Sequence, residues 1–107
     1  MSLAVPSVSA ADCQPAVSGM IGWWPGDGDP DDIFGTNNGI LHVGATATNI
    51  GLVGQCFSFD GTNDFVEIPN AAVLQPSNLT VEAWVRFSSL NSKASNPGHQ
   101  YIVFREN

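Results

Sequence analysis

The polar residues best placed for chemistry lie in 54–69, GQCFSFDGTNDFVEIP, where Asp60, Asn63 and Asp64 fall close together. Carboxylate and amide oxygens at this spacing are ligands for a hard cation such as calcium, which takes roughly six to eight oxygens. The same residues also suit a tight turn, because Asp side chains accept backbone N–H bonds and Gly61 tolerates a left-handed backbone. The sequence leaves both uses open.

The acidic residues and histidines do not form a recognisable catalytic set. Hydrolysis of glycans needs two carboxylates roughly 5–9.5 Å apart across one sugar, whereas Glu67 and Glu82 stand singly on separate segments. His42 and His99 are far apart in the sequence, and no serine-nucleophile or metal-hydrolase motif is present. We therefore expect no enzymatic activity, and we expect His42 to be a partly exposed strand residue rather than a catalytic base.

A second candidate site lies in 79–87, LTVEAWVRF, the most regular alternating stretch of the chain. In a strand, one face of this stretch carries apolar side chains and the other carries Glu82, Trp84 and Arg86. An aromatic ring flanked by groups that bond hydroxyls has the composition of a carbohydrate-binding site. Packing of Trp84 in a core is the alternative.

The charge balance excludes whole classes of partner. Among 107 residues, 10 Asp and Glu stand against 3 Lys and Arg, giving a net charge of −7. Such a chain cannot neutralise a run of phosphates, which excludes nucleic acid and anionic membrane surfaces as partners. No stretch approaches the roughly 18 apolar residues of a membrane-spanning helix. The length allows a single domain.

The N-terminal region, 1–18, is predicted to be a leader or a flexible tail. Residues 3–11 are uncharged, rich in small side chains and similar to the cleavage region of a secretory signal, which predicts secretion. A disulfide between Cys13 and Cys56 would close a loop long enough to contribute about 4 kcal/mol on the loop-entropy model. Two free thiols are the alternative.

The rest of the chain alternates short apolar runs with loops rich in Gly, Pro and Asn, which predicts antiparallel strands. Strands are expected at 19–24, 40–43, 55–60, 64–68, 79–87 and 101–104, with 44–51 a loop or weak strand and a helical turn near 71–74. The third and fourth of these strands are expected to pair as a hairpin around the polar tip. Their core-facing side chains would be Phe57, Phe59, Val66 and Ile68. Six strands with long loops predict an all-β antiparallel β-sandwich or jelly roll.

Three segments in this order resemble the laminin-G-like jelly roll of the concanavalin A-like lectin and glucanase superfamily. They are GMIGWWPGDGDPDDIFGTNNGIL from position 19, GLVGQCFSFDGTNDFVEIP from position 51 and LTVEAWVRF from position 79. The resemblance implies a concanavalin A-like domain over 19–107. It also implies a non-catalytic extracellular module that binds carbohydrate or a glycosylated protein, often with calcium. Carried over to this sequence, the calcium ligands would be Asp32, Asn38, Asp60, Asn63 and Asp64.

The sequence departs from this family after 101–105, where a complete domain continues with further strands. We therefore expect the jelly roll to be truncated at its C-terminal end, with exposed sheet edges and an uncovered apolar face. Soluble proteins avoid such surfaces, so we expect a homodimer or other self-association. Two other functions stay open: a structural or assembly segment that pairs with another chain through its sheet edges, and a severed ancillary domain of a glycoside hydrolase.

Overall fold

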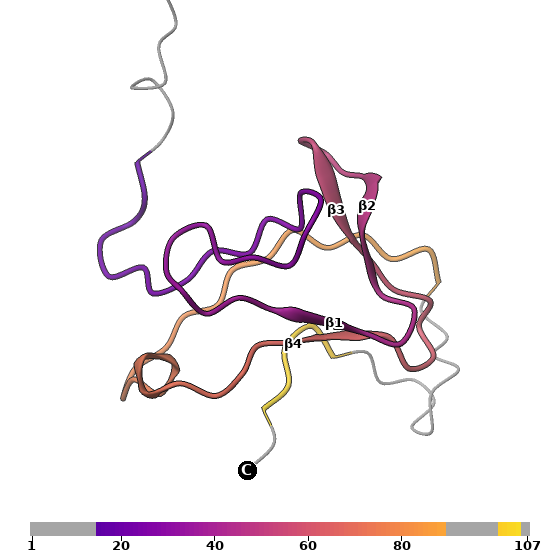
Figure 1. The fold of residues 1–107 in the computed structure, drawn as a ribbon. Helices are drawn as coiled ribbons and strands as arrows, with labels where there is room; N and C mark the ends of the chain where they lie inside the picture. The colour runs from indigo at the N-terminus through magenta and orange to yellow at the C-terminus, as the bar shows by residue number, and fades with distance from the viewer. Residues whose placement is uncertain (1–14, 90–100, 106–107) are drawn as a thin grey trace, which may run out of the picture.

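The computed structural model describes residues 15–89 and 101–105, and its regular structure is almost entirely antiparallel β. The described elements, in chain order, are the strands β1 (Ile40–His42), β2 (Thr46–Ile50), β3 (Gln55–Ser58) and β4 (Phe65–Glu67), followed by the 3₁₀ turn η2 (Ala72–Leu74) (Figure 1). The all-β class predicted from the sequence is therefore confirmed. The helical turn predicted near 71–74 is confirmed as well.

The four strands form two antiparallel pairs that are nested in the sequence. The inner pair is β2 with β3, where Ile50 lies opposite Gln55, and the outer pair is β1 with β4, where Leu41 lies opposite Val66. Residues 40–67 are thus one two-stranded ribbon, and Figure 1 shows its inner and outer parts running in clearly different directions. A register shift between Thr46 and Asn49 lies in the inner pair.

The hairpin predicted between 55–60 and 64–68 is wrong, although both strands exist. β3 pairs with β2, and β4 pairs with β1, so the polar segment 59–64 is a corner between two ladders rather than a hairpin tip. The tight turn of the inner pair lies instead at Gly51–Gly54, where the Gly51 N–H donates to the Gly54 carbonyl at 2.9 Å. Gly54 has φ +63°, a conformation that glycine adopts without strain.

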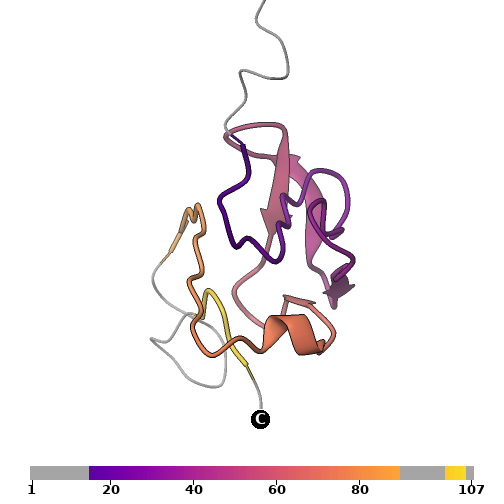
Figure 2. The ribbon, with the colours of Figure 1, turned by 90° about the vertical axis from the view of Figure 1, so that its left-hand side faces the viewer.

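Three predicted strands are absent from the ladders. Residues 19–24, 79–87 and 101–104 form no strand, and none of them is paired with a strand in the described part of the chain. A β-strand is stabilised by its hydrogen bonds and cross-strand contacts, so an alternating sequence alone cannot produce one. Segment 79–87 therefore runs outside both ladders, orange in Figures 1 and 2.

Two glycines allow loops to pack closely on the ribbon. A Cβ at Gly39 would lie 2.8 Å from Val66 and 3.1 Å from Ile68, so these half-buried side chains lie directly over its backbone. A Cβ at Gly26 would similarly lie within 2.9 Å of the Phe57 ring. Val66, Ile68 and Phe57 are thus half-buried, as expected, whereas Phe59 is 50% exposed.

Much apolar surface remains uncovered. Among the described residues the buried hydrophobic side chains are Ala45 and Ala47. A wide hollow of about 3040 Å³ opens beside β3, with segment 79–87 among its walls. Figure 2 shows that segment running apart from the strand pairs.

Candidate functional site

Asp32, a predicted calcium ligand, is the organising residue of the acidic loop. Its side chain is only 6% exposed, and its Oδ1 accepts backbone N–H bonds from Trp23, Phe34 and Gly35 at 2.9–3.0 Å. Its Oδ2 accepts a fourth from Asn37 at 3.2 Å. One carboxylate therefore fixes the path of the loop and ties it to the segment that contains Trp23.

These hydrogen bonds hold Asp32 in its charged form. Burial raises the pKa of Asp32, but the four backbone donors outweigh it and lower the pKa from 3.8 to about 2. The donors supply the positive electrostatic environment that a cation would otherwise supply. With three donors on Oδ1, that atom has no lone pair left for a metal ion.

Asn38, the second predicted ligand in this loop, does lie beside Asp32. Its Oδ1 accepts the Asp32 backbone N–H at 3.1 Å, so the structure brings the two residues together in a hydrogen-bonded turn. The Trp24 indole N–H closes the same loop by donating to the Asn37 carbonyl at 2.7 Å. Trp23 is 48% exposed and Trp24 half-buried, consistent with the two rings pointing to different sides.

Asp60 and Asp64 form the second predicted group, and both organise the corner at 59–64. Asp60 Oδ1 accepts the Thr62 N–H at 2.8 Å, while Gly61 has φ +75°, as expected for the turn alternative. Asp64 accepts the Asp60 N–H at 3.0 Å and the Gly44 N–H at 2.8 Å. Asp64 thus joins the two connections between the inner and outer ladders.

The five predicted calcium ligands therefore fall into two hydrogen-bonded groups and one exposed amide. Asn63 lies exposed in the corner beside Asp64. Among the described residues, no group of three or more His, Cys, Asp or Glu side chains is arranged to hold a metal ion. Calcium also uses amide and backbone oxygens as ligands, and calcium binding stays a prediction.

The predicted carbohydrate-binding residues all lie exposed on segment 79–87. Trp84 is 95% exposed, so the alternative of a core tryptophan is wrong in this structure. Glu82 and Arg86 are exposed as well. If the segment were a β-strand, the three side chains would lie on one side of the backbone.

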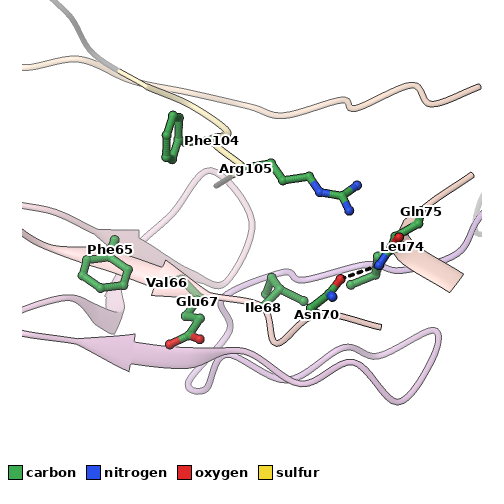
Figure 3. A pocket seen from close by; sticks show the side chains of 9 residues that line it. All are labelled: Phe65, Val66, Glu67, Ile68, Asn70, Leu74, Gln75, Phe104 and Arg105. Atoms are coloured by element: carbon green, nitrogen blue, oxygen red, sulfur yellow. Dashed lines mark hydrogen bonds between the residues drawn. The ribbon is translucent and has the colours of Figure 1, made fainter. Parts of the chain in front are cut away.

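A groove that the sequence did not indicate lies between β4, η2 and residues 101–105. This β4–η2 groove has a volume of about 810 Å³, within the usual range for small-molecule sites. Its lining combines aromatic rings with amide, carboxylate and guanidinium groups: Phe65, Glu67, Asn70, Gln75, Phe104 and Arg105. The Gln75 amide donates to Asn70 Oδ1 at 2.8 Å, and Figure 3 shows the Arg105 side chain extending across the groove toward them.

One wall of the groove is fixed by a contact between β1 and β4. The His42 Nε2 and Glu67 Oε2 atoms are 2.6 Å apart. The His42 ring also stacks on Phe65, with centroids 4.5 Å apart and planes within 9°. His42 is half-buried on β1, as expected for a strand residue, and it holds Glu67 and Phe65 in fixed positions.

The disulfide stays a prediction. Cys56 is half-buried on β3, whereas Cys13 lies outside the described residues. Residues 1–14 of the predicted leader or tail, and His99, also lie outside the described residues. Within 15–89 and 101–105, no helix is long and apolar enough to cross a bilayer.

No family model, curated protein or solved structure matches the chain. The resemblance to laminin-G-like domains therefore rests on its sequence motifs alone.

The groove residues could not have been singled out from the sequence. Glu67, Asn70 and Gln75 are near one another along the chain, but Phe104 and Arg105 come from a segment about 30 residues away that meets them only in the folded protein. Isolated Asn, Gln and Arg residues outside any motif carry no local signal.

Proposed function

We propose that this protein is a non-catalytic, secreted carbohydrate-binding module that recognises a glycan or a glycosylated protein. The observation that carries the proposal is the composition of the β4–η2 groove, where aromatic rings and planar hydrogen-bonding groups line one concave surface. Aromatic faces pack against sugar C–H groups, while amides, carboxylates and guanidinium groups bond hydroxyls. A concanavalin A-like sandwich, of which the two ladders would be a part, is the fold proposed with it.

The exposed group Glu82, Trp84 and Arg86 is the competing location for the same function. Trp84 offers a larger aromatic surface than Phe104, which is 70% exposed, but it lies on a single extended segment rather than in a concave site. A ligand buries more of its surface in a groove than on an isolated side chain. The groove is therefore the preferred location.

A glycan array probed with the labelled full chain, followed by calorimetry on a bound glycan, tests the proposal. Phe104→Ala and Gln75→Ala are expected to weaken binding at least about tenfold, because each removes one type of sugar contact. Trp84→Ala is the control and is expected to leave binding unchanged. Loss of binding in Trp84→Ala alone would move the site to 79–87, and an array without signal would contradict carbohydrate recognition.

A second function, assembly with another chain, is favoured by a separate observation. No hydrogen bond joins the backbone of 79–87 to any other described residue, so the segment offers a complete set of donors and acceptors to an added strand. Strand addition uses these backbone groups and does not involve the groove.

The predicted calcium ligands lie apart from both locations, in the loops at 26–38 and 59–64. Calcium assistance is therefore a separate proposal, with its own test by titration.

A further inference from the structure

Segment 79–87 has the properties of a strand that lacks its neighbour. Its residues alternate between apolar and polar, and its backbone is unpaired within the part of the chain that the structure describes. The apolar side chains are still about half exposed: Leu79 61%, Val81 54%, Val85 46% and Phe87 49%. An added strand would satisfy the backbone and cover part of this surface at once.

The charges on the segment identify what that strand should carry. Glu82 and Arg86 lie two positions to either side of Trp84 on the same face. An antiparallel partner must therefore place a cation opposite Glu82 and an anion opposite Arg86, with an aromatic or similar side chain between them. Segment 79–87 of a second copy, running in the opposite direction, has this order, because it places Arg86 opposite Glu82 and Glu82 opposite Arg86.

We infer that two copies of this chain pair through 79–87 as antiparallel strands, with the two-fold axis at Trp84. Each Glu82 then lies opposite Arg86 of the second copy, and the two Trp84 side chains lie opposite each other. On the other face, Val81 lies opposite Phe87 and Ala83 opposite Val85. Each contact therefore occurs twice: residue i of the first copy lies opposite residue j of the second, and residue j of the first lies opposite residue i of the second, as a closed two-fold dimer requires.

Other symmetric registers lose the charge pairing. An axis at Ala83 would place Glu82 opposite Trp84 and Arg86 opposite Thr80, leaving both charges without an ionic partner. An axis at Val85 would place Glu82 opposite Ser88. Since each opposite-charge pair contributes roughly 0.2–1 kcal/mol and occurs twice by symmetry, the axis at Trp84 is preferred.

This inference is independent of carbohydrate binding in the β4–η2 groove and gives the assembly function its partner. It leaves the two Trp84 rings side by side on one face of the new ladder. A chain that dimerises without binding glycans, or binds glycans as a monomer, separates the two proposals.

Disulfide trapping tests the register in the full chain, with Cys13→Ser and Cys56→Ser removing the native thiols. Opposite residues of an antiparallel pair have Cα atoms roughly 4.5–5.5 Å apart, which a disulfide can bridge. Trp84→Cys is therefore expected to give a covalent dimer on mild oxidation. Thr80→Cys is the matched control, because its two copies would lie about 27 Å apart along the ladder and stay unlinked.

A charge swap tests the pairing in the chain with its native cysteines, by sedimentation at micromolar concentrations. Glu82→Arg places like charges opposite each other twice and is expected to weaken dimerisation about tenfold, as is Arg86→Glu. The double swap restores both pairs and should restore the dimer. A monomeric native chain, single swaps that dimerise like the native chain, or equal cross-linking at positions 80 and 84 would overturn the inference.

Discussion

Removing the carboxylate of Asp32 should destabilise the fold far more than removing the carboxylate of any other Asp in the loop at 26–38. Asp32→Ala leaves four backbone N–H groups without their acceptor: those of Trp23, Phe34, Gly35 and Asn37. A hydrogen bond to a charged group contributes roughly 1.5–3 kcal/mol. Several of these donors can turn toward water once the carboxylate is gone, so we expect a loss of about 3 kcal/mol rather than the sum of four bonds.

Asp32→Asn should cost less, about 1–2 kcal/mol, because the amide retains one acceptor but places a donor against the N–H of Asn37. Asp31→Asn is the matched control. It removes the same charge from the neighbouring position, where the residue is exposed and its backbone N–H, rather than its side chain, bonds to Asp29. We expect this change to stay within about 0.5 kcal/mol of the native protein.

Urea unfolding followed by tryptophan fluorescence measures these differences, because Trp23 and Trp24 both belong to the structure that Asp32 holds. The urea midpoint should be highest for Asp31→Asn, lower for Asp32→Asn and lowest for Asp32→Ala. The slope of the free energy of unfolding against urea concentration should stay unchanged. If Asp32→Ala unfolds at the same urea concentration as Asp31→Asn, the four hydrogen bonds do not hold the loop.

The native pKa of Asp32, about 2, lies below its ordinary 3.8, so charged Asp32 stabilises the folded protein by on the order of 2 kcal/mol. This contribution is complete above about pH 5 and is lost as pH falls through about 2, so the stability difference from Asp32→Asn should shrink over that interval. Gly39→Ala should lower the free energy of unfolding by about 1–3 kcal/mol, measured with urea, because its Cβ would lie 2.8 Å from Val66. Gly61→Asn should be nearly neutral, because position 61 has open space around it and Asn tolerates a positive φ. If calcium binds at the predicted ligands, calcium chloride should give a saturable calorimetric heat and raise Tm. No heat and an unchanged Tm would show that these carboxylates serve only to accept the backbone N–H bonds of their loops.

Strand positions were easier to predict from the sequence than strand partners. The runs at 40–43, 55–60 and 64–68 all contain strands, because alternation and turn residues act locally. Their pairing depends on which turn closes first, and Gly51-Leu52-Val53-Gly54 resembles part of an apolar run rather than a turn. The polar tip at 60–64 carried the stronger turn signal but became a corner, because Asp64 bonds to Gly44 rather than closing a hairpin.

The candidate sites show the same division. Asp32 lies beside Asn38, and Asp60 beside Asp64, because residues near one another in a loop are brought together by local hydrogen bonds. What the carboxylates bind depends on which backbone groups face them, and this is a property of the folded loop. Segment 79–87 shows why alternation alone does not predict a strand. Its apolar and polar residues alternate as in a strand, but a strand forms only when a neighbouring strand pairs with it.

The nested ribbon also determines the order in which this region can fold. Direct pairing of Ile40 with Glu67 must close the whole intervening chain, whereas the turn at Gly51–Gly54 closes only a few residues, and a hairpin of that kind forms in roughly 1–10 µs. Once β2 and β3 are paired, only 43–45 and 59–64 remain to be closed before β1 meets β4. Substitutions at Gly54 should therefore slow folding, while substitutions at the His42–Glu67 contact should mainly accelerate unfolding.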